Sequence, residues 1–546
     1  MLKNTDHNKP QRMPRHFLTK LTVGILFFIV LSNLIIPMLM LLGQSLDFDP
    51  FYKGFVDAFA SAATRRALVN SVLVSLLSSV LSVSAAFFYA YIVECKLKGR
   101  VRRIFNFIPI LPMLMPSITH GLVIVYLFGR MGIFTRLLGI QLPIYGLLGI
   151  VMGSFFYAFP IAFLMLSQGF ANLDGRLYEN ATILGVLPFR RFYEIVLPIM
   201  KYAIFSAFAV CFTMVFTDYG IPLSVGGTYS ILPILFYKNV VGLLNFSKGA
   251  IYSTMILVPA AAVYILDIFY FSKKQVSGRH NIIRVNSGPF HPMQKVPFTL
   301  LTIILLIPVL LVALAPFVRA WPYDMSLTVE HFVRIIKVGT LTKLVRNSVV
   351  VAFATGLFGM LIAFCAGYTY IRSGDEIKLP KKIVHGLFMV TLAVPGLALG
   401  LSYAMFYRGS MLYNTLIILI IVNIMHFFGS PYMMVISHFK LLNPNLEAIC
   451  KTLGGNRYHV MVDVIIPNSK KMLRDVFVYF FTNTMITISA VSLLYHTKTM
   501  TLALQITAYN DQGMWESAVA VSLVILLINI VAKLVQVLGT QNAVYR

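Results

Sequence analysis

Twelve long runs of apolar residues recur along this chain of 546 residues. Most are as long as the roughly 20 residues that an α-helix needs to cross the hydrocarbon core of a bilayer. Hydrophobic residues make up 58% of the chain and charged residues only 12%. A soluble protein of this composition would have too little polar surface to cover its apolar mass. We therefore predict a protein that crosses a membrane many times.

The predicted spans in the first half cover residues 21–42, 69–93, 104–129, 144–166, 203–217 and 251–271. Those in the second half cover residues 298–318, 348–371, 386–407, 412–436, 476–495 and 517–532. Helices are expected because isolated strands cannot satisfy their backbone groups in lipid, and no alternating pattern suggests a barrel. The predicted fold class is an all-α membrane protein with about twelve transmembrane helices in two homologous six-helix halves.

An internal repeat supports this division into halves. The tripeptide Asn-Ser-Val, a proline in the following span and a glycine in a later loop recur in the same order, at Asn70, Pro116 and Gly185 and again at Asn347, Pro395 and Gly454. Such a fixed order at nearly constant spacing indicates duplication. We predict a tail over residues 1–20, a first half over 21–271, a polar linker over 272–297 and a second half over 298–546.

The positions of the cations predict how the chain is oriented. If the amino terminus is cytoplasmic, the inner segments hold 31 of the 45 Lys and Arg residues. Cytoplasmic loops of membrane proteins carry an excess of these residues. Both termini, the linker and the two loops that contain Gly185 and Gly454 are therefore expected in the cytoplasm.

The loop between the fourth and fifth spans carries a motif of specific spacing, E-x-A-x3-G-x9-I-x-L-P. Its landmarks are Glu179, Ala181, Gly185 and Pro198. Small residues allow another protein to approach closely, and a proline fixes the chain where the next span begins. An ordinary interfacial helix followed by a glycine turn is the alternative explanation.

A weaker copy lies between the tenth and eleventh spans, where thirteen residues again separate Gly454 from Pro467. Here the position of the motif glutamate is occupied by Ala448, and Glu447 lies one residue early. Either Glu447 replaces the missing carboxylate or the contact in this half is apolar. The two loops are thus predicted to be equivalent in place but different in chemistry.

The motif resembles the "EAA" loop of membrane subunits in ATP-binding cassette importers, in which a short cytoplasmic helix docks into the ATPase. The resemblance implies two fused permease halves in a bacterial-type plasma (inner) membrane, with Glu179 helping to hold the ATPase contact. It also implies two partners, an ATPase dimer and an extracytoplasmic solute-binding protein. ATP and Mg²⁺ would be bound by the ATPase, so no cofactor is expected in this chain.

Two further stretches resemble permeases for iron(III) and for 2-aminoethylphosphonate, the first from Phe216 to Tyr237 and the second from Thr487 to Tyr495. Either solute is expected, with a slight preference for the phosphonate. The candidate residues of the translocation path are Thr217, Asp218, Tyr219, Thr487 and Ser489. An ionisable residue in a membrane segment is usually functional, although Asp218 could instead be solvated at the outer interface. The hydroxyl groups of Thr487 and Ser489 could equally pack helices together.

Three other polar residues in the spans receive structural interpretations. His120 and His426 are expected to be hydrogen-bonded within the bundle, although either could contact a solute or a metal. Asp267, near the end of the sixth span, is expected to form an interfacial ion pair with Lys273 or Lys274.

Several classes of function are excluded by what the sequence lacks. It has no phosphate-binding loop of the G-x-x-x-x-G-K-[ST] type, so the chain is not expected to hydrolyse ATP or to be an enzyme. The four cysteines are scattered and predict neither disulfides nor a metal site. The net charge of +26 is spread over short loops, which fits a lipid bilayer and not a nucleic acid. An ion-coupled secondary transporter with twelve spans remains the alternative, but most spans lack the buried charges that such coupling requires.

Overall fold

The computed structural model describes residues 17–46, 53–139, 141–267, 290–337, 340–373 and 378–541. Most of the predicted tail (1–20) and linker (272–297), together with Lys273 and Lys274, lies outside the described residues. Within them the chain is almost wholly helical, and its strands are β1 (Val318–Ala320) and β2 (Asp324–Leu327), which form one antiparallel hairpin. The predicted all-α membrane fold is confirmed.

The helices of the first half are α1 (Phe17–Val30), η1 (Leu31–Ile35), α2 (Ile36–Leu46), α3 (Lys53–Ala60), α4 (Ala62–Cys95), α5 (Gly99–Phe107), η2 (Ile108–Leu114), α6 (Ser117–Phe128), α7 (Ile133–Leu138), α8 (Leu147–Ala171), α9 (Gly175–Ile183), α10 (Pro188–Arg191), η3 (Phe192–Val196), α11 (Leu197–Thr217), α12 (Gly220–Val225), α13 (Leu232–Tyr237), η4 (Lys238–Gly242) and α14 (Phe246–Leu266).

The helices of the second half are α15 (Pro292–Leu314), η7 (Ala315–Phe317), α16 (Glu330–Lys337), α17 (Thr340–Arg372), α18 (Lys378–Val390), α19 (Gly396–Phe406), α20 (Leu416–Phe427), α21 (Gly429–Leu441), α22 (Asn445–Thr452), α23 (Arg457–His459), η9 (Val460–Ile465), α24 (Ile466–Ile486), α25 (Leu502–Asp511) and α26 (Trp515–Gln541).

Nine helical segments in the described part of the chain are long and apolar enough to cross a membrane, and the bent pair α20 and α21 brings the number to ten. The two remaining predicted spans take other forms. Residues 386–407 are divided between α18 and α19. Residues 476–495 correspond only in part to α24, which begins earlier, ends at Ile486 and carries four charged residues in its first half, Lys470, Lys471, Arg474 and Asp475.

Prolines interrupt the third predicted span and its counterpart in the second half. Residues 108–114 form the tighter 3₁₀ helix η2, and α6 begins directly after Pro116. In the second half a turn at residues 391–394 separates α18 from α19, which begins directly after Pro395. A proline lacks the N–H that would continue the helix but fits well at a helix start. The prolines therefore place two helix breaks inside the bundle.

The repeated Asn-Ser pair makes the same contacts in both halves. The Asn70 amide donates to the carbonyl of Ser230, and the Ser71 hydroxyl accepts from the backbone N–H of Leu232. In the second half Asn347 donates to the carbonyls of Lys498 and Met500, and Ser348 accepts from the N–H of Leu502. The first pair joins α4 to the start of α13, and the second joins α17 to the start of α25. The duplication thus extends to individual hydrogen bonds.

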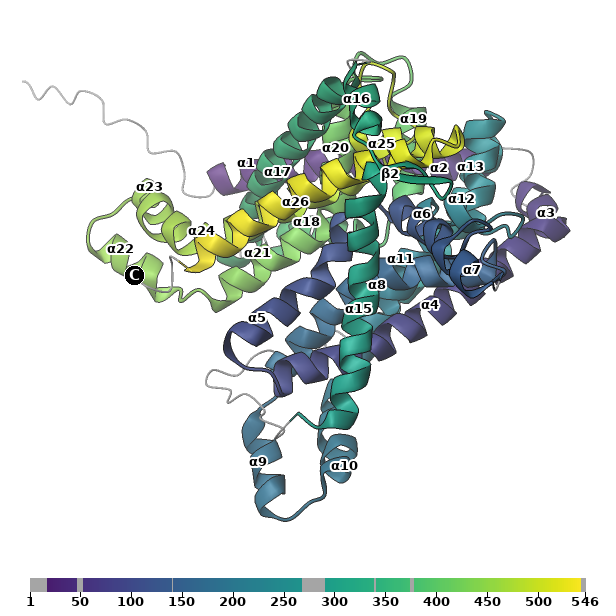
Figure 1. Ribbon diagram of the computed structural model, residues 1–546. Helices are drawn as coiled ribbons and strands as arrows, with labels where there is room; N and C mark the ends of the chain where they lie inside the picture. Colours follow the sequence, from purple (N-terminus) through teal and green to yellow (C-terminus); the bar gives the residue numbers. More distant parts are fainter. Residues whose placement is uncertain are drawn as a thin grey trace, which may run out of the picture.

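The first helix of each half packs against the other half. The segment from α1 to α2 lies against α17, α18 and α19, and α15 lies against α4, η2 and α6 (Figure 1). A bulge of the π type at η1 presents Asn33, whose backbone and side-chain oxygens accept from the hydroxyls of Tyr403 and Tyr407 at 2.5 and 3.0 Å. Because the first helix of each half packs on the opposite half, the two halves are held together.

Candidate functional site

Two short loops project from the helical body, one carrying α9 and α10 and the other carrying α22 and α23 (Figure 1). Gly185 and Gly454 adopt φ of +73° and +84°, which turns the chain after α9 and α22. A π-type segment, η3 or η9, then leads into α11 or α24, with Pro198 and Pro467 in the first turn. The backbone of the weaker copy is therefore the same as that of the complete motif.

Large apolar side chains cover the exposed tips of both loops. Leu184 is 80% exposed and its equivalent Leu453 is 83% exposed, each directly before the turning glycine. Phe189 and Tyr458 are likewise exposed and equivalent in position. Exposed apolar patches mark surfaces that contact another protein or the membrane. The motif residues did not identify these side chains, although the apolar Leu-Gly pair shared by both copies could have done so.

The motif residues themselves occupy different environments. Glu179 is exposed on α9, whereas Ala181 is buried on its inner face. Gly185 has open space around it, since an added Cβ would meet no atom within 4 Å. Its role is therefore conformational, because a positive φ costs any other residue about 1–2 kcal/mol.

Arg191 holds the first loop together from within. Its guanidinium lies 5.0 Å from the centre of the Tyr178 ring and also donates to the Thr182 hydroxyl. A second pair, Arg190 and Glu194, is solvent-exposed and linked at 2.6 Å. This ion pair contributes little stability at such exposure. Glu179 is left at the surface, where a partner could reach it.

In the second loop the position of Tyr178 is taken by Glu447, and the holding contact changes. The Glu447 carboxylate pairs with Arg372 at the end of α17 at 3.1 Å, and both side chains are nearly buried. Arg372 also donates to the carbonyls of Phe439 and Leu442. Glu447 therefore faces its own chain, while Ala448, at the position of Glu179, is exposed. The second loop presents an apolar surface without the motif carboxylate.

We expect Arg372→Met to loosen the second loop and leave the first loop unchanged. The substitution leaves the largely buried Glu447 carboxylate without its partner, which lowers the stability of the loop by on the order of 1–3 kcal/mol. Hydrogen exchange of the α22 amides should therefore become several-fold faster, with α9 as the internal control. The double variant Arg372→Met with Glu447→Leu removes both charges and should restore much of the protection. Unchanged exchange in the single variant would show that the ion pair does not hold this loop.

A cavity of about 510 Å³ lies between the two halves, with walls from α8, α11 and α14 on one side and from α20, α21 and α24 on the other. Its polar lining comprises Tyr157, Thr213, Thr217, Asp218, Tyr264, Asp267, Thr391, His426, Ser430, Tyr479, Asn483 and Ser489. Two of these residues are carboxylates, and none of the described residues that line the cavity is a lysine or an arginine. The cavity thus combines an apolar lining with a set of polar side chains whose charged members are acidic.

Three of the five predicted path residues line this cavity, Thr217, Asp218 and Ser489. Asp218 lies in the break between α11 and α12, where its carboxylate accepts from the N–H of Ile221 at 3.0 Å. The Thr217 hydroxyl donates to the carbonyl of Thr213 at 3.0 Å. The carboxylate therefore has a fixed position on the wall and is only partly covered by protein.

The other two predicted path residues are not among those that line the cavity. Tyr219 is 1% exposed and its ring stacks on that of Tyr237, with centroids 5.3 Å apart. Thr487 is buried, and its hydroxyl donates to the carbonyl of Asn483 at 2.7 Å. The position of Thr487 agrees with the alternative that its hydroxyl lies within the helix packing, and Tyr219, predicted on the path, lies in the aromatic core instead.

Asp267 and His426 lie on the cavity wall. For His426 this agrees with the alternative that it contacts a solute, whereas the sequence did not place Asp267 on the path. Asp267 is 8% exposed and accepts from the Ser206 hydroxyl at 2.5 Å, and its predicted partners Lys273 and Lys274 lie outside the described residues. His426 and Ser489 crowd Gly396 from two sides, so no larger side chain fits there. His120, in contrast, is fully buried in α6 away from this lining.

Comparison with known proteins agrees with this architecture. A family model described as "Binding-protein-dependent transport system inner membrane component" matches the chain twice, over residues 80–275 and 357–541. The putative ferric transport system permease protein FbpB 1 of Haemophilus influenzae is 24% identical over 505 residues, which cover 86% of this chain and 76% of the relative. The ferric transport system permease protein FbpB of Actinobacillus pleuropneumoniae is 23% identical over 511 residues, covering 88% and 72%.

A shorter relative matches only part of the chain. The molybdenum transport system permease protein ModB of Mycobacterium bovis is 26% identical over 222 residues, which make up 39% of this chain and 82% of ModB. A protein of about half the size thus aligns over less than half of this one. Together with the doubled family match, this confirms the internal duplication predicted from the sequence.

Proposed function

This chain belongs to the family of binding-protein-dependent transport system inner membrane components, and we propose that it forms the translocation path of an importer for ferric iron. Proteins of this family are membrane transport subunits and not enzymes. In this proposal an ATPase dimer docks on the two projecting loops from the cytoplasm and binds ATP and Mg²⁺. A solute-binding protein delivers the ion to the opposite face, and both termini of the chain are cytoplasmic.

The composition of the central cavity is the observation that carries the choice of solute. Asp218 and Asp267 give its wall two carboxylates, with no cation among the described lining residues to offset them. Sites lined by carboxylates favour cations, whereas paths for anions and phosphates use Arg or Lys. Carboxylate, hydroxyl and carbonyl oxygens are also the ligands that hard cations prefer. The cavity therefore favours iron(III) over 2-aminoethylphosphonate, against the slight preference drawn from sequence.

The names of the relatives support the same choice. Both long relatives, which align with more than four fifths of this chain, are named as ferric transport permeases. The ModB match covers 39% of this chain, because ModB is itself only about half as long. The relatives that align with most of this chain thus carry the ferric name.

Transport in proteoliposomes tests the proposal. The chain is reconstituted with its ATPase, ATP is enclosed, and the binding protein is supplied outside with radiolabelled ferric citrate. We expect iron to accumulate only when ATP is enclosed, and excess 2-aminoethylphosphonate should not compete. Accumulation driven by a proton gradient without ATP would indicate the secondary transporter instead. Uptake of the phosphonate in place of iron would refute the proposed solute but not the coupling.

A further inference from the structure

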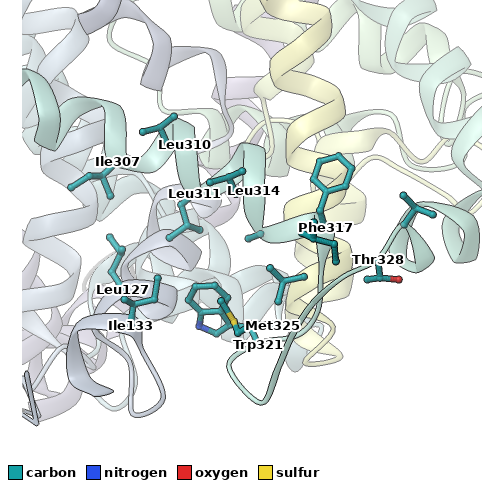
Figure 2. A pocket seen from close by; sticks show the side chains of 14 residues that line it. Leu127, Ile133, Ile307, Leu310, Leu311, Leu314, Phe317, Trp321, Met325 and Thr328 are labelled. Atoms are coloured by element: carbon teal, nitrogen blue, oxygen red, sulfur yellow. The ribbon is translucent and has the colours of Figure 1, made fainter. Parts of the chain in front are cut away.

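A larger hollow of about 980 Å³ lies at the far end of α15, near the β1–β2 hairpin and away from α9 and α10 (Figures 1 and 2). We call it the α15 groove. One wall comes from the first half, with Leu127 of α6 and Ile133 of α7. The other comes from α15 and the hairpin, including Leu311 and Trp321. The groove is separate from the central cavity and shares no lining residue with it.

One wall of the groove belongs to a segment that is long and apolar enough to span a membrane. Residues Pro292–Phe317 form one of the apolar segments long enough to cross a bilayer, and the last turns of this segment line the groove. Leu310 and Leu314 are exposed there. Since a transmembrane helix is surrounded by hydrocarbon along most of its length, an occupant of this part must be apolar.

The hairpin end of the groove has polar groups that the protein itself does not satisfy. The indole Nε1 of Trp321 is buried and has no hydrogen-bond partner among the described residues. A buried indole N–H normally finds an acceptor. Figure 2 shows the Trp321 ring among the lining side chains. A ligand that fits must therefore bring an acceptor to this end.

Two arginines lie on the α7 side of the same end. Arg130 is exposed in the turn between α6 and α7, and Arg136 of α7 donates to the carbonyl of Pro322, next to Trp321, at 2.8 Å. The acidic groups at the hairpin have partners there, because Asp324 pairs with Arg319 of β1 at 3.6 Å and Glu516 of α26 accepts from the backbone N–H of Trp321 at 3.3 Å. The exposed charge on the α7 side is positive and suits a phosphate.

We propose that the α15 groove binds one glycerophospholipid between the two halves of the chain. Its acyl chains lie along α15, an ester carbonyl accepts the Trp321 indole N–H, and the phosphate lies near Arg130 and Arg136. The volume is at the upper end of the range of roughly 300–1,000 Å³ typical of ligand pockets, as a lipid would need. This site is independent of the transported solute.

The two tryptophans of the chain permit a direct test. Trp515→Phe leaves Trp321 as the single reporter in the groove, and Trp321→Phe leaves Trp515 at the start of α26 as the matched control. The delipidated chain in detergent is titrated with phosphatidylglycerol brominated on its acyl chains. We expect Trp321 fluorescence to be quenched to saturation at about one lipid per chain, and Trp515 to lose little fluorescence without saturating.

Two substitutions locate the lipid. Because Leu310 and Leu314 are exposed, Leu310→Asn with Leu314→Asn should leave the fold intact and weaken the saturable binding at least fivefold. Arg130→Gln should reduce the preference for phosphatidylglycerol over phosphatidylcholine, whereas Arg66→Gln, at an exposed arginine on α4, should not.

Equal, non-saturating quenching of both tryptophans would overturn the proposal. So would saturable quenching that none of these substitutions changes, or a protein found in place of lipid by native mass spectrometry.

Discussion

Asp218→Asn is expected to lower ferric-ion uptake at least tenfold while the chain remains folded. Asparagine keeps the carbonyl oxygen that caps the N–H of Ile221, so the break between α11 and α12 should persist. It removes one of the two carboxylates of the cavity. Losing about 1.4 kcal/mol of attraction for the ion corresponds to a tenfold change, and a single charge near a trivalent cation in a partly desolvated cavity contributes at least that much.

The matched control is Asp57→Asn, which makes the same chemical change at an exposed position on α3 and should leave uptake unchanged. Asp267→Asn should also reduce uptake, and the double variant should transport least. Initial uptake rates in proteoliposomes, at equal amounts of folded protein, provide the measurement. Uptake that is unaffected or increased by Asp218→Asn would contradict a cationic solute, since removing negative charge favours an anion.

Leu184→Asp combined with Leu453→Asp is expected to abolish solute-dependent ATP hydrolysis by the complex. These two leucines are the most exposed apolar residues of their loops at equivalent positions. Burying a carboxylate in place of an apolar contact at the centre of an interface costs about 2 kcal/mol or more per site, which is roughly 30-fold in affinity. The ATPase subunit should therefore no longer co-purify with the chain.

Met411→Asp is the matched control, because Met411 is 99% exposed in the turn before α20, outside both loops. It should leave assembly and hydrolysis unchanged. The single variants measure the asymmetry between the loops. Since only the first loop presents its motif glutamate, we expect Leu453→Asp to be the more damaging single change, because the second loop depends more on apolar contact. Normal co-purification of the double variant would show that the ATPase docks elsewhere.

Much of the fold could be predicted from the sequence, because each span must be a helix of about 20 mostly apolar residues that satisfies its own backbone hydrogen bonds. The repeat was also visible, since Asn70 and Asn347 make hydrogen bonds that depend on their exact position. The packing of each first helix on the opposite half was not visible, because the apolar pattern of α1 and α15 does not specify which helices are their neighbours. The span predicted over residues 386–407 is divided by the turn before Pro395, because a proline cannot continue a helix but fits at the start of a new one.

The candidate site was predicted less completely. The spacing from Gly185 to Pro198 identified the loop because a turn with positive φ and a helix start leave a fixed signature. The exposure of Leu184 and Leu453 was not predicted, although a leucine precedes the turning glycine in both copies, because a leucine by itself does not show whether it is exposed or buried. The ion pair predicted for Asp267 involves Lys273 or Lys274, which lie outside the described residues, but its hydrogen bond from Ser206, 61 residues away in sequence, could not be predicted. Residues brought together across the bundle leave no local signal.

Cross-linking of the loop tips to the ATPase tests the central claim most directly. Cysteines replace Leu184 and Leu453, one at a time, in a chain whose native Cys365 and Cys450 are changed to serine to remove the less buried thiols. With a short bifunctional reagent, each tip is predicted to form a covalent adduct with the ATPase subunit, and the yield should change when ATP is added. Cysteine at Met411 should form none. The absence of an adduct from both tips, in an assembled and active complex, would contradict the account.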